Sequence, residues 1–301
     1  MRVVSLVPAA TEILCALGLG DQIVGISHDC DFPAEVINRP RLTRTRLTSD
    51  LSSYEIDREV RASVASGHSL YAIQAELLEA LRPDLVITQG QCSVCAVDRG
   101  RTICALESLK LQTRSLSLAA SDFSGLYRDI LAVGTATSRS RQAETLVVSL
   151  QERISRIVAK TSRLCSPRVF CLSWFDPLMA AGNWIAQMVK LAGGDPRLGG
   201  EGKASSRVLI QQVQSESPEI VFLLPCSFSQ TQTGKEWIRL RDSLPWSHLP
   251  AVRNGRVFAL ASHLFHRPGP RLVDGVELLA ALTHPSRCAF SAATDFSQRV
   301  A

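Results

Sequence analysis

Two short segments of the chain combine cysteine with histidine in a way that suits metal or redox chemistry. His28 and Cys30 come directly after one apolar run, and Cys92 and Cys95 come directly after another. Both runs are predicted strands of a parallel sheet, and the loops that follow such strands share the carboxyl edge of the sheet. One imidazole and three thiolates can hold tetrahedral zinc, so these four side chains form a candidate zinc site.

The same segments allow two other interpretations. Cys92 and Cys95 have the C-x-x-C spacing of a thiol redox pair, and all four side chains could instead serve plain packing. A single C-x-x-C pair is weak evidence because it is common by chance, but two loops on one sheet edge strengthen the case. The residues alone leave metal binding, redox chemistry and packing open.

The elements that would position these loops alternate between strand and helix. Short apolar runs predict strands, and apolar residues at helical spacing predict helices, some of which stop at glycine or proline. The predicted strands cover residues 2–7, 22–27, 84–88 and 111–116, and the predicted helices cover 11–17, 70–81 and 104–109. This alternation indicates a mostly parallel sheet with helices on both faces.

From Asp122 to about residue 161 the pattern is helical, and residues 141–160 predict one long helix. Alternation then returns, with predicted strands at 168–173, 219–224 and 257–260 and predicted helices at 184–191, 208–216 and 272–282. Residues 43–69 predict a small helical insert at a lobe edge. Residues 285–301 lack apolar periodicity, so we expect a flexible tail.

The two halves of the chain echo each other. The segment Leu81-Arg82-Pro83-Asp84-Leu85-Val86-Ile87 parallels Glu216-Ser217-Pro218-Glu219-Ile220-Val221-Phe222. We therefore predict an α/β fold of two Rossmann-like lobes with mostly parallel sheets, joined by one long rigid helix, with a ligand cleft between the lobes. The expected parts are an N-terminal lobe at 1–121, a connecting helical segment at 122–163, a C-terminal lobe at 164–284 and the tail at 285–301.

Composition excludes several classes of protein. The 301 residues carry a net charge of +5 without a basic stripe, so nucleic-acid binding is not expected. No apolar run approaches the ~20 residues that span a bilayer, and the N-terminus does not read as a secretory signal. The nine scattered cysteines do not suit a disulfide framework. These features favour the cytoplasm, or a periplasmic or membrane-associated protein whose export signal has been removed.

Several stretches of the chain resemble the iron-siderophore/cobalamin periplasmic-binding family, the class III solute-binding proteins of ABC transporters. They are Arg2-Val3-Val4-Ser5-Leu6-Val7-Pro8-Ala9-Ala10-Thr11-Glu12, Leu17-Gly18-Leu19-Gly20-Asp21-Gln22-Ile23-Val24-Gly25, Leu81-Arg82-Pro83-Asp84-Leu85-Val86-Ile87, and Asn183-Trp184-Ile185 with Leu191-Ala192-Gly193-Gly194. The resemblance covers about residues 1–284 and looks closest to the cobalamin-binding branch. It implies a monomer with two lobes joined by one long helix, which binds cobalamin or a related corrinoid and delivers it to an ABC importer.

On this resemblance, the ligand would contact the loops at the lobe edges. Trp174 and Phe175 could stack on a corrin ring or instead pack the core, Arg267 could hold a phosphate, and His28 or a thiolate could ligate cobalt. The expected ligand-binding residues are Pro8, His28, Cys30, Gln89, Gln91, Cys92, Cys95, Trp174, Phe175, Trp184, Phe265, His266 and Arg267, of which His28, Cys30, Cys92 and Cys95 are also the candidate metal ligands.

The resemblance further implies one carboxylate on each lobe that docks onto arginines of an ABC permease. The position in the N-terminal lobe falls on Glu76, but the one in the C-terminal lobe falls on the uncharged Gln211, with Glu201 and Glu216 nearby. This departure puts a conventional permease partner in doubt.

No catalytic motif appears in the chain, since it lacks a Gly-x-Gly-x-x-Gly loop, a Walker loop and a Gly-x-Ser-x-Gly elbow. We therefore expect a binding protein for a small molecule rather than an enzyme. Two alternatives remain. One is a cytoplasmic protein that handles corrinoids or metals, and the other is a thiol-dependent redox or metal protein that uses Cys92 and Cys95.

Overall fold

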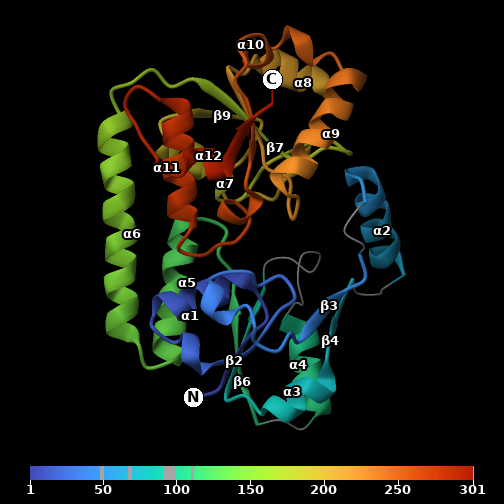
Figure 1. Ribbon diagram of the computed structural model, residues 1–301, viewed down its shortest axis with the longest axis vertical. Coiled ribbons are helices and arrows are strands. Elements are labelled where there is room, and N and C mark those ends of the chain that lie inside the picture. Colours follow the sequence, from blue (N-terminus) through green and yellow to red (C-terminus); the bar gives the residue numbers. More distant parts are fainter. Residues whose placement is uncertain (48–50, 67–69, 91–98, 110–111, 301) are drawn as a thin grey trace. The chain divides into compact units, whose positions relative to one another are not determined.

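The computed structural model describes residues 1–47, 51–66, 70–90, 99–109 and 112–300, and the chain folds into two compact units (Figure 1). Unit 1 consists of Met1–Leu51, Arg58–Ser149 and Pro268–Pro270, and unit 2 consists of Ser52–Asp57, Leu150–Arg267 and Arg271–Ala301. Each unit is built on its own largely parallel sheet. The predicted two-lobed α/β fold is therefore confirmed.

Unit 1 contains a four-stranded parallel sheet with the strand order β2-β1-β5-β6. Its strands are β1 (Val3–Ser5), β2 (Ile23–Ile26), β5 (Leu85–Gln89) and β6 (Arg114–Leu118), and its helices are α1 (Pro8–Ala16), α3 (Ala75–Leu81), α4 (Arg99–Ser108) and α5 (Phe123–Ala136). The central strands β1 and β5 are buried apart from Gln89. Such burial is expected of parallel strands that are covered on both faces of the sheet.

An arm interrupts unit 1 between β2 and α3. It consists of β3 (Thr43–Thr45), α2 (Ser53–Ala65) and β4 (Tyr71–Ile73), and β3 pairs with β4 in antiparallel fashion. The predicted helix at 70–81 is wrong at its start. Tyr71–Ile73 is extended because it bonds to β3, and the N–H of Gln74 donates to the carbonyl of Leu42 at 2.8 Å. The helix therefore begins only at Ala75.

Unit 2 contains a seven-stranded sheet with the order β10-β8-β7-β11-β12-β13, and β9 also pairs with β7. The strands are β7 (Arg168–Trp174), β8 (Met179–Ala180), β9 (Asp195–Arg197), β10 (Ser206–Arg207), β11 (Ile220–Leu223), β12 (Val257–Leu260) and β13 (Ser297–Arg299), and the helices are α7 (Ile185–Leu191), α8 (Ile210–Glu216), α9 (Gln230–Ser243), α10 (Pro250–Arg253), α11 (Leu272–Thr283) and α12 (Ala293–Phe296). The strands β7, β9, β11 and β12 run parallel, whereas β8 and β13 run antiparallel to their partners in this group.

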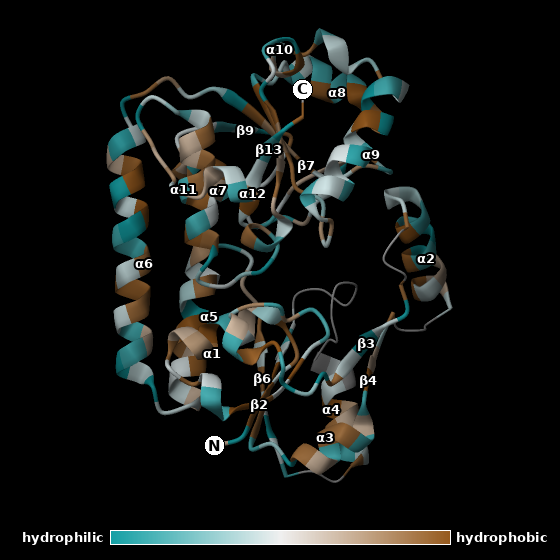
Figure 2. Ribbon diagram, viewed as in Figure 1, coloured by the Kyte–Doolittle hydropathy of each residue, from teal (hydrophilic) through white to brown (hydrophobic). Residues whose placement is uncertain are grey.

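The long helix predicted near 141–160 is present as α6 (Ser140–Thr161), whose first part belongs to unit 1 and whose second part belongs to unit 2. Hydrophobic and hydrophilic bands alternate along it (Figure 2). Within unit 2, Arg153 of α6 donates to both carboxylate oxygens of Glu277 at 2.8 and 3.0 Å and also to Asp274, which fixes α6 to α11. No helix in the described ranges is long and apolar enough to cross a membrane.

The end of the chain is not the flexible tail that its lack of periodicity predicted. It forms α12 and β13, and β13 pairs antiparallel with β12. The N–H of Ala261 donates to the carbonyl of Phe296 at 2.9 Å, and the N–H of Val300 donates to the carbonyl of Val257 at 3.0 Å. These bonds use only the backbone and need no regular apolar side chains, so the pattern of residues could not reveal this edge strand.

A polar clamp fixes the amino end of the sheet in unit 1. The α3 helix ends at Leu81, the next residue Arg82 takes the left-handed conformation with φ 41°, and Pro83 follows. The carboxylate of Asp84 accepts the backbone N–H of Arg2 at 2.7 Å, and Nε of Arg2 donates to the carbonyl of Leu81 at 2.8 Å. The clamp thus ties the start of β1 to the turn that leads into β5.

Unit 2 repeats this clamp with different residues. The α8 helix ends at Glu216, the next residue Ser217 takes the left-handed conformation with φ 48°, and Pro218 follows. The carboxylate of Glu219 accepts the backbone N–H of Arg168 at 3.0 Å, and Nε of Arg168 donates to the carbonyl of Ser217 at 3.0 Å. The sequence echo between the two halves therefore corresponds to one device that holds β1 against β5 and β7 against β11.

Removing the clamp carboxylate should weaken the unit that contains it. We expect Asp84→Ala to lower the free energy of unfolding by about 1 kcal/mol, because a backbone N–H loses a charged acceptor. Glu219→Ala should act similarly, whereas Asp84→Asn should cost less because its amide oxygen can accept the same bond. Urea unfolding followed by circular dichroism measures these changes.

The matched control is Asp21→Ala, which removes a fully exposed carboxylate whose nearest cation, on Arg39, lies 3.9 Å away. The control should leave the urea midpoint unchanged. Equal losses in the control and in Asp84→Ala would show that the clamp has no special role.

Candidate functional site

The carboxyl edge of each sheet carries residues that the sequence singled out. In unit 1, Pro8 follows β1, His28 follows β2 and Gln89 ends β5. In unit 2, Trp174 ends β7 and His266 follows β12. All five are half-buried. Each unit thus gathers residues from distant parts of the chain at the edge where parallel α/β sheets bind ligands.

His28 is held in place by both strands of the arm. Its Nδ1 lies 2.7 Å from Oγ1 of Thr43, which also accepts the backbone N–H of His28 at 2.9 Å. Its ring lies beside that of Tyr71, with centroids 5.3 Å apart and planes at 30°. Burial lowers the pKa of His28, and the charge of Arg41 lowers it further although Asp29 opposes this. The imidazole is therefore favoured in its neutral form.

Arg41 positions the loop after β2, and the sequence analysis did not identify it. Its Nη1 donates to three backbone carbonyls, those of Ser27 at 3.2 Å, His28 at 2.7 Å and Cys30 at 3.3 Å. One guanidinium thus fixes the turn that presents His28. No motif marks this arginine, because its partners are backbone atoms that any sequence would supply.

Cys30 lies in the interior of unit 1 rather than at the surface of the loop. The residue is fully buried, and its Sγ lies 3.1 Å from both Oγ1 of Thr11 and Oγ of Ser27. Burial raises the pKa of the Cys30 thiol although these hydroxyl contacts partly oppose the change. The thiol therefore ties the loop to α1, and its geometry does not present a thiolate to a ligand.

The remaining candidate metal ligands, Cys92 and Cys95, lie outside the described residues, as does Gln91. The loop begins at Gly90, whose N–H donates to the carbonyl of Leu118 at 2.8 Å. Within the described ranges, no group of histidine, cysteine and carboxylate side chains is arranged to hold a metal ion. The described half of the predicted zinc site thus offers no support for zinc.

Trp174 presents a fixed aromatic ring at the edge of unit 2. Its Nε1 donates to the carbonyl of Asp176 at 3.1 Å, and its ring lies 5.4 Å from that of Phe228 at 55°. Because these contacts use the indole nitrogen and part of the ring while the residue stays half-buried, an apolar surface remains at the edge.

The other aromatic candidates in unit 2 pack in its core. Phe175 is 3% exposed, Trp184 is 6% exposed and Phe265 is fully buried. Nε1 of Trp184 donates to the carbonyl of Phe265 at 2.6 Å. For Phe175 this is the packing alternative that the sequence left open, and all three residues are buried.

His266 joins two of the loops at the edge of unit 2. Its Nε2 bonds to the carbonyl of Leu224, directly after β11. A carbonyl only accepts hydrogen bonds, so Nε2 carries a proton and Nδ1 is the acceptor when the ring is neutral. The neighbouring Arg267 is half-buried.

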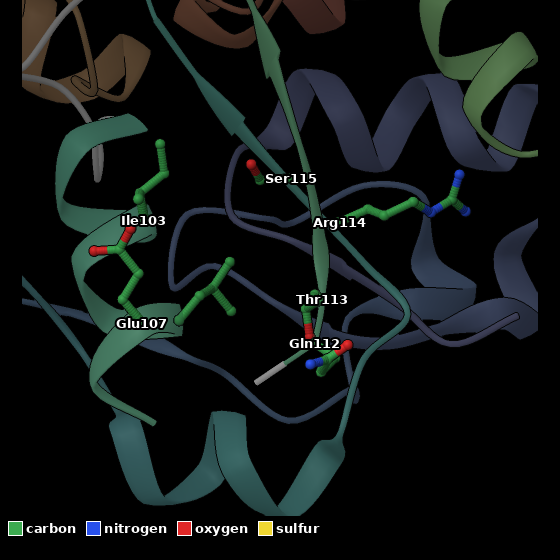
Figure 3. Close-up of a pocket in the computed structure, with 7 residues that line it drawn as sticks. Ile103, Glu107, Gln112, Thr113, Arg114 and Ser115 are labelled. Atoms are coloured by element: carbon green, nitrogen blue, oxygen red, sulfur yellow. The ribbon is translucent and has the colours of Figure 1, made fainter. Parts of the chain in front are cut away.

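A cavity of about 560 Å³ lies elsewhere in unit 1, between α4 and β6. It is lined by Ile103, Leu106, Glu107, Gln112, Thr113, Arg114 and Ser115 (Figure 3). The side chain of Arg114 points away from α4, and its Nη2 donates to the carbonyl of Ala136 at 3.3 Å. Because the β6 residues here begin the strand, the cavity lies toward the amino end of the sheet. It contains no predicted site residue, and we do not assign the ligand to it.

The two positions compared with permease-docking carboxylates are equivalent in the structure. Glu76 is the second residue of α3 and Gln211 the second residue of α8, and both are exposed. The carboxylates that could replace Gln211 are engaged, since Glu201 lies 2.9 Å from Lys190 and Glu216 lies 3.1 Å from Arg197. Only one of the two equivalent positions therefore carries a charge.

The lowered pKa of His28 predicts a specific response to acid. The unfolded chain binds a proton at this histidine at higher pH than the folded protein does, so the folded state loses stability as the pH falls through the unfolded value near 6.5. We expect His28→Gln to lose less thermal stability than the wild type between pH 7.5 and 5.5. Thermal unfolding at both pH values measures this, with the exposed His248→Gln as the control. A wild-type response in His28→Gln would contradict the assignment.

Three comparisons with known proteins bear on this arrangement. The chain is 26% identical to an uncharacterized ABC transporter substrate-binding lipoprotein of Bacillus subtilis (strain 168), over 94% of this chain and 80% of that protein. It is 26% identical to a vitamin B12-binding protein of Vibrio parahaemolyticus, over 91% of this chain and 86% of that protein. Its fold is similar to that of a periplasmic heme binding protein from Pseudomonas aeruginosa, with a TM-score of 0.74 and 21% identity over 100% of this chain and 98% of that one.

A family model described as "Periplasmic binding protein" matches residues 3–264. The match includes the clamp of unit 2, the arm and every predicted site residue except Phe265, His266 and Arg267. Because it extends over far more than half of the chain, the chain belongs to the periplasmic binding protein family.

Proposed function

We propose that this protein binds a corrinoid and passes it to an ABC-type importer. The observation that carries the proposal is that each unit holds an aromatic ring at the carboxyl edge of its own sheet, His28 in unit 1 and Trp174 in unit 2. The similarity to a vitamin B12-binding protein over 91% of the chain supports the choice of ligand. Flat macrocycles combine apolar faces with polar rims, and such ligands suit a rigid aromatic ring flanked by hydrogen-bonding groups.

The half-buried edge residues would each contact a different part of the ligand. Trp174 would contact an apolar face of the corrin ring, and Gln89 would hydrogen-bond to its amide side chains. Arg267 would hold the phosphate of a nucleotide loop through its guanidinium. His28, which is favoured as a neutral imidazole, would offer a ligand for cobalt. None of these roles breaks a bond in the ligand, so we propose a binding protein rather than an enzyme.

We also propose that the protein works outside the cytoplasmic membrane. The support comes from the family to which it belongs and from its similarity to a substrate-binding lipoprotein of an ABC transporter. The expectation of a cytoplasmic protein finds no support among these relatives. Glu76 would contact a permease in this setting, and Gln211 would contribute a neutral contact at the equivalent position of unit 2.

Haem is the second candidate ligand. Two observations favour it, the fold similarity to a heme binding protein and the position of Tyr71 beside His28. Histidine and tyrosine are both axial ligands of haem iron. The aromatic contact at Trp174 suits either macrocycle. The two candidates therefore differ in the metal ion and in the side chain that would ligate it.

Titration of the purified, reduced protein with cyanocobalamin, hydroxocobalamin and hemin separates these candidates. We expect saturable binding of a corrinoid with one molecule per chain. A spectral change with hydroxocobalamin alone would indicate that a side chain ligates cobalt, and His28→Gln should abolish it. Saturable binding of hemin without binding of either corrinoid would contradict the proposal.

Trp174 should be the main apolar contact. We expect Trp174→Ala to weaken binding of cyanocobalamin about tenfold, because a buried aromatic contact is lost, and Trp174→Phe to retain most of the affinity. Ile238→Ala, at an exposed position of α9, is the control and should bind like the wild type. Calorimetry measures the affinity. Unchanged affinity in a folded Trp174→Ala variant would remove Trp174 from the site.

A further inference from the structure

The C-terminal segment of the chain adds an outer strand to the sheet of unit 2. It forms α12 and β13, both of which belong to this unit (Figure 2). The family model matches residues 3–264, so this segment lies outside the matched range. In the antiparallel pairing of β12 with β13, Ser297 lies opposite Leu260, the last residue of β12. The segment therefore reaches the carboxyl edge of the sheet, where the predicted ligand-binding residues of unit 2 are found.

Phe296 contacts the turn that follows β12 at two points. Its carbonyl accepts the backbone N–H of Ala261 at 2.9 Å. Its ring meets that of His263 edge to face, with centroids 5.6 Å apart and planes at 80°. Aromatic pairs prefer this kind of arrangement to a face-to-face stack. One residue of the C-terminal segment thus holds both the first residue of the turn and a ring on its side.

The same turn presents His266. Residues Ser262–Leu264 form one turn of 3-10 helix, and the carbonyl of Ser262 accepts the backbone N–H of His266 at 3.0 Å. The ring of His266 bonds through Nε2 to the carbonyl of Leu224, directly after β11. The ring of His266 is therefore fixed by the loop after β11, and its backbone is fixed by a turn that rests on Phe296.

Phe296 holds this turn without belonging to the core of unit 2. No residue of α12 is buried, and Phe296 itself is half-buried. The end of the segment is attached by other contacts. The N–H of Val300 donates to the carbonyl of Val257 at 3.0 Å, and the guanidinium of Arg299 lies 5.8 Å from the ring centroid of Phe258. Removing the ring of Phe296 should therefore loosen the turn while β13 stays in place.

We propose that Phe296 is a positioning residue for the ligand-binding edge of unit 2. Through Ala261 and His263 it fixes the turn that presents His266 and the following Arg267. Ordering such a turn before the ligand arrives reduces the entropy that is lost on binding. The positioning stands on contacts within unit 2, whereas its effect on ligand affinity rests on the proposed function.

Hydrogen–deuterium exchange of the protein without ligand tests the positioning. The backbone amides of residues 264–266 are hydrogen-bonded within the turn. We expect them to exchange about fivefold faster in Phe296→Ala than in the wild type, because opening the turn no longer breaks the ring contact. Phe296→Tyr keeps a ring and should exchange like the wild type. The control Gln298→Ala removes an exposed side chain of β13 and should leave these amides unchanged.

Two results would overturn the positioning role. One is an unchanged exchange rate of residues 264–266 in Phe296→Ala. The other is an increase that extends equally over β7 and β11, because this would indicate a general loss of stability. Where Phe296→Ala does not fold, Phe296→Leu decides the question, since it keeps an apolar side chain without a ring that can meet His263. It should give a smaller increase at the same amides, and an unchanged rate there would contradict the proposal.

The effect on the ligand is measured separately, by calorimetry with cyanocobalamin as the probe. We expect Phe296→Ala to bind it about threefold more weakly than the wild type, because the turn must be ordered on binding. Phe296→Tyr and Gln298→Ala should bind like the wild type. Unchanged affinity in a Phe296→Ala variant whose turn exchanges faster would contradict the link to the ligand. If the wild type does not bind cyanocobalamin, the proposed function fails, and the exchange data still decide whether Phe296 positions the turn.

Discussion

Asp84 and Glu219 each accept the backbone N–H of an arginine at the start of a neighbouring central strand, Arg2 just before β1 and Arg168 in β7. The side chain of each arginine donates to a carbonyl at the end of the helix that precedes the carboxylate. Each clamp fixes where two central strands begin relative to each other. Since strands of fixed register also end at fixed places, the clamp at the amino edge sets the positions of the loops at the carboxyl edge. The positions of Gln89, which ends β5, and Trp174, which ends β7, depend on this constraint.

The edges themselves are stiffened by different means in the two units. In unit 1, Arg41 gathers the carbonyls of the loop after β2 and Thr43 holds the imidazole of His28. In unit 2, His266 joins the loops after β11 and β12, and Phe228 supports Trp174. A binding protein gains affinity when its contacts are ordered before the ligand arrives, because less entropy is lost on binding. The family to which the chain belongs is consistent with such a role.

Much of the fold could be predicted from local signals. Helix ends at Gly18 and Pro83 and the buried run at β5 are visible in the residues themselves, and they gave the alternation of both lobes. The start of β4 and the strand β13 were missed because backbone bonds to a distant strand hold them. Within the site, neighbouring Trp174 and Phe175 look alike in sequence, yet one lies at the edge and the other in the core. That difference depends on the turn after β7, where Phe175 packs into the core of unit 2. The interior position of Cys30 likewise depends on its contact with α1.

The most direct test of this account is to map the ligand contacts by hydroxyl-radical footprinting with and without cyanocobalamin. The account predicts protection at the carboxyl-edge loops of both units, at Trp174 and His266 in unit 2 and around His28 in unit 1. It predicts no protection at Ile103 and Leu106, which line the cavity between α4 and β6. Protection confined to that cavity, or to one unit alone, would contradict the claim that both carboxyl edges bind the ligand.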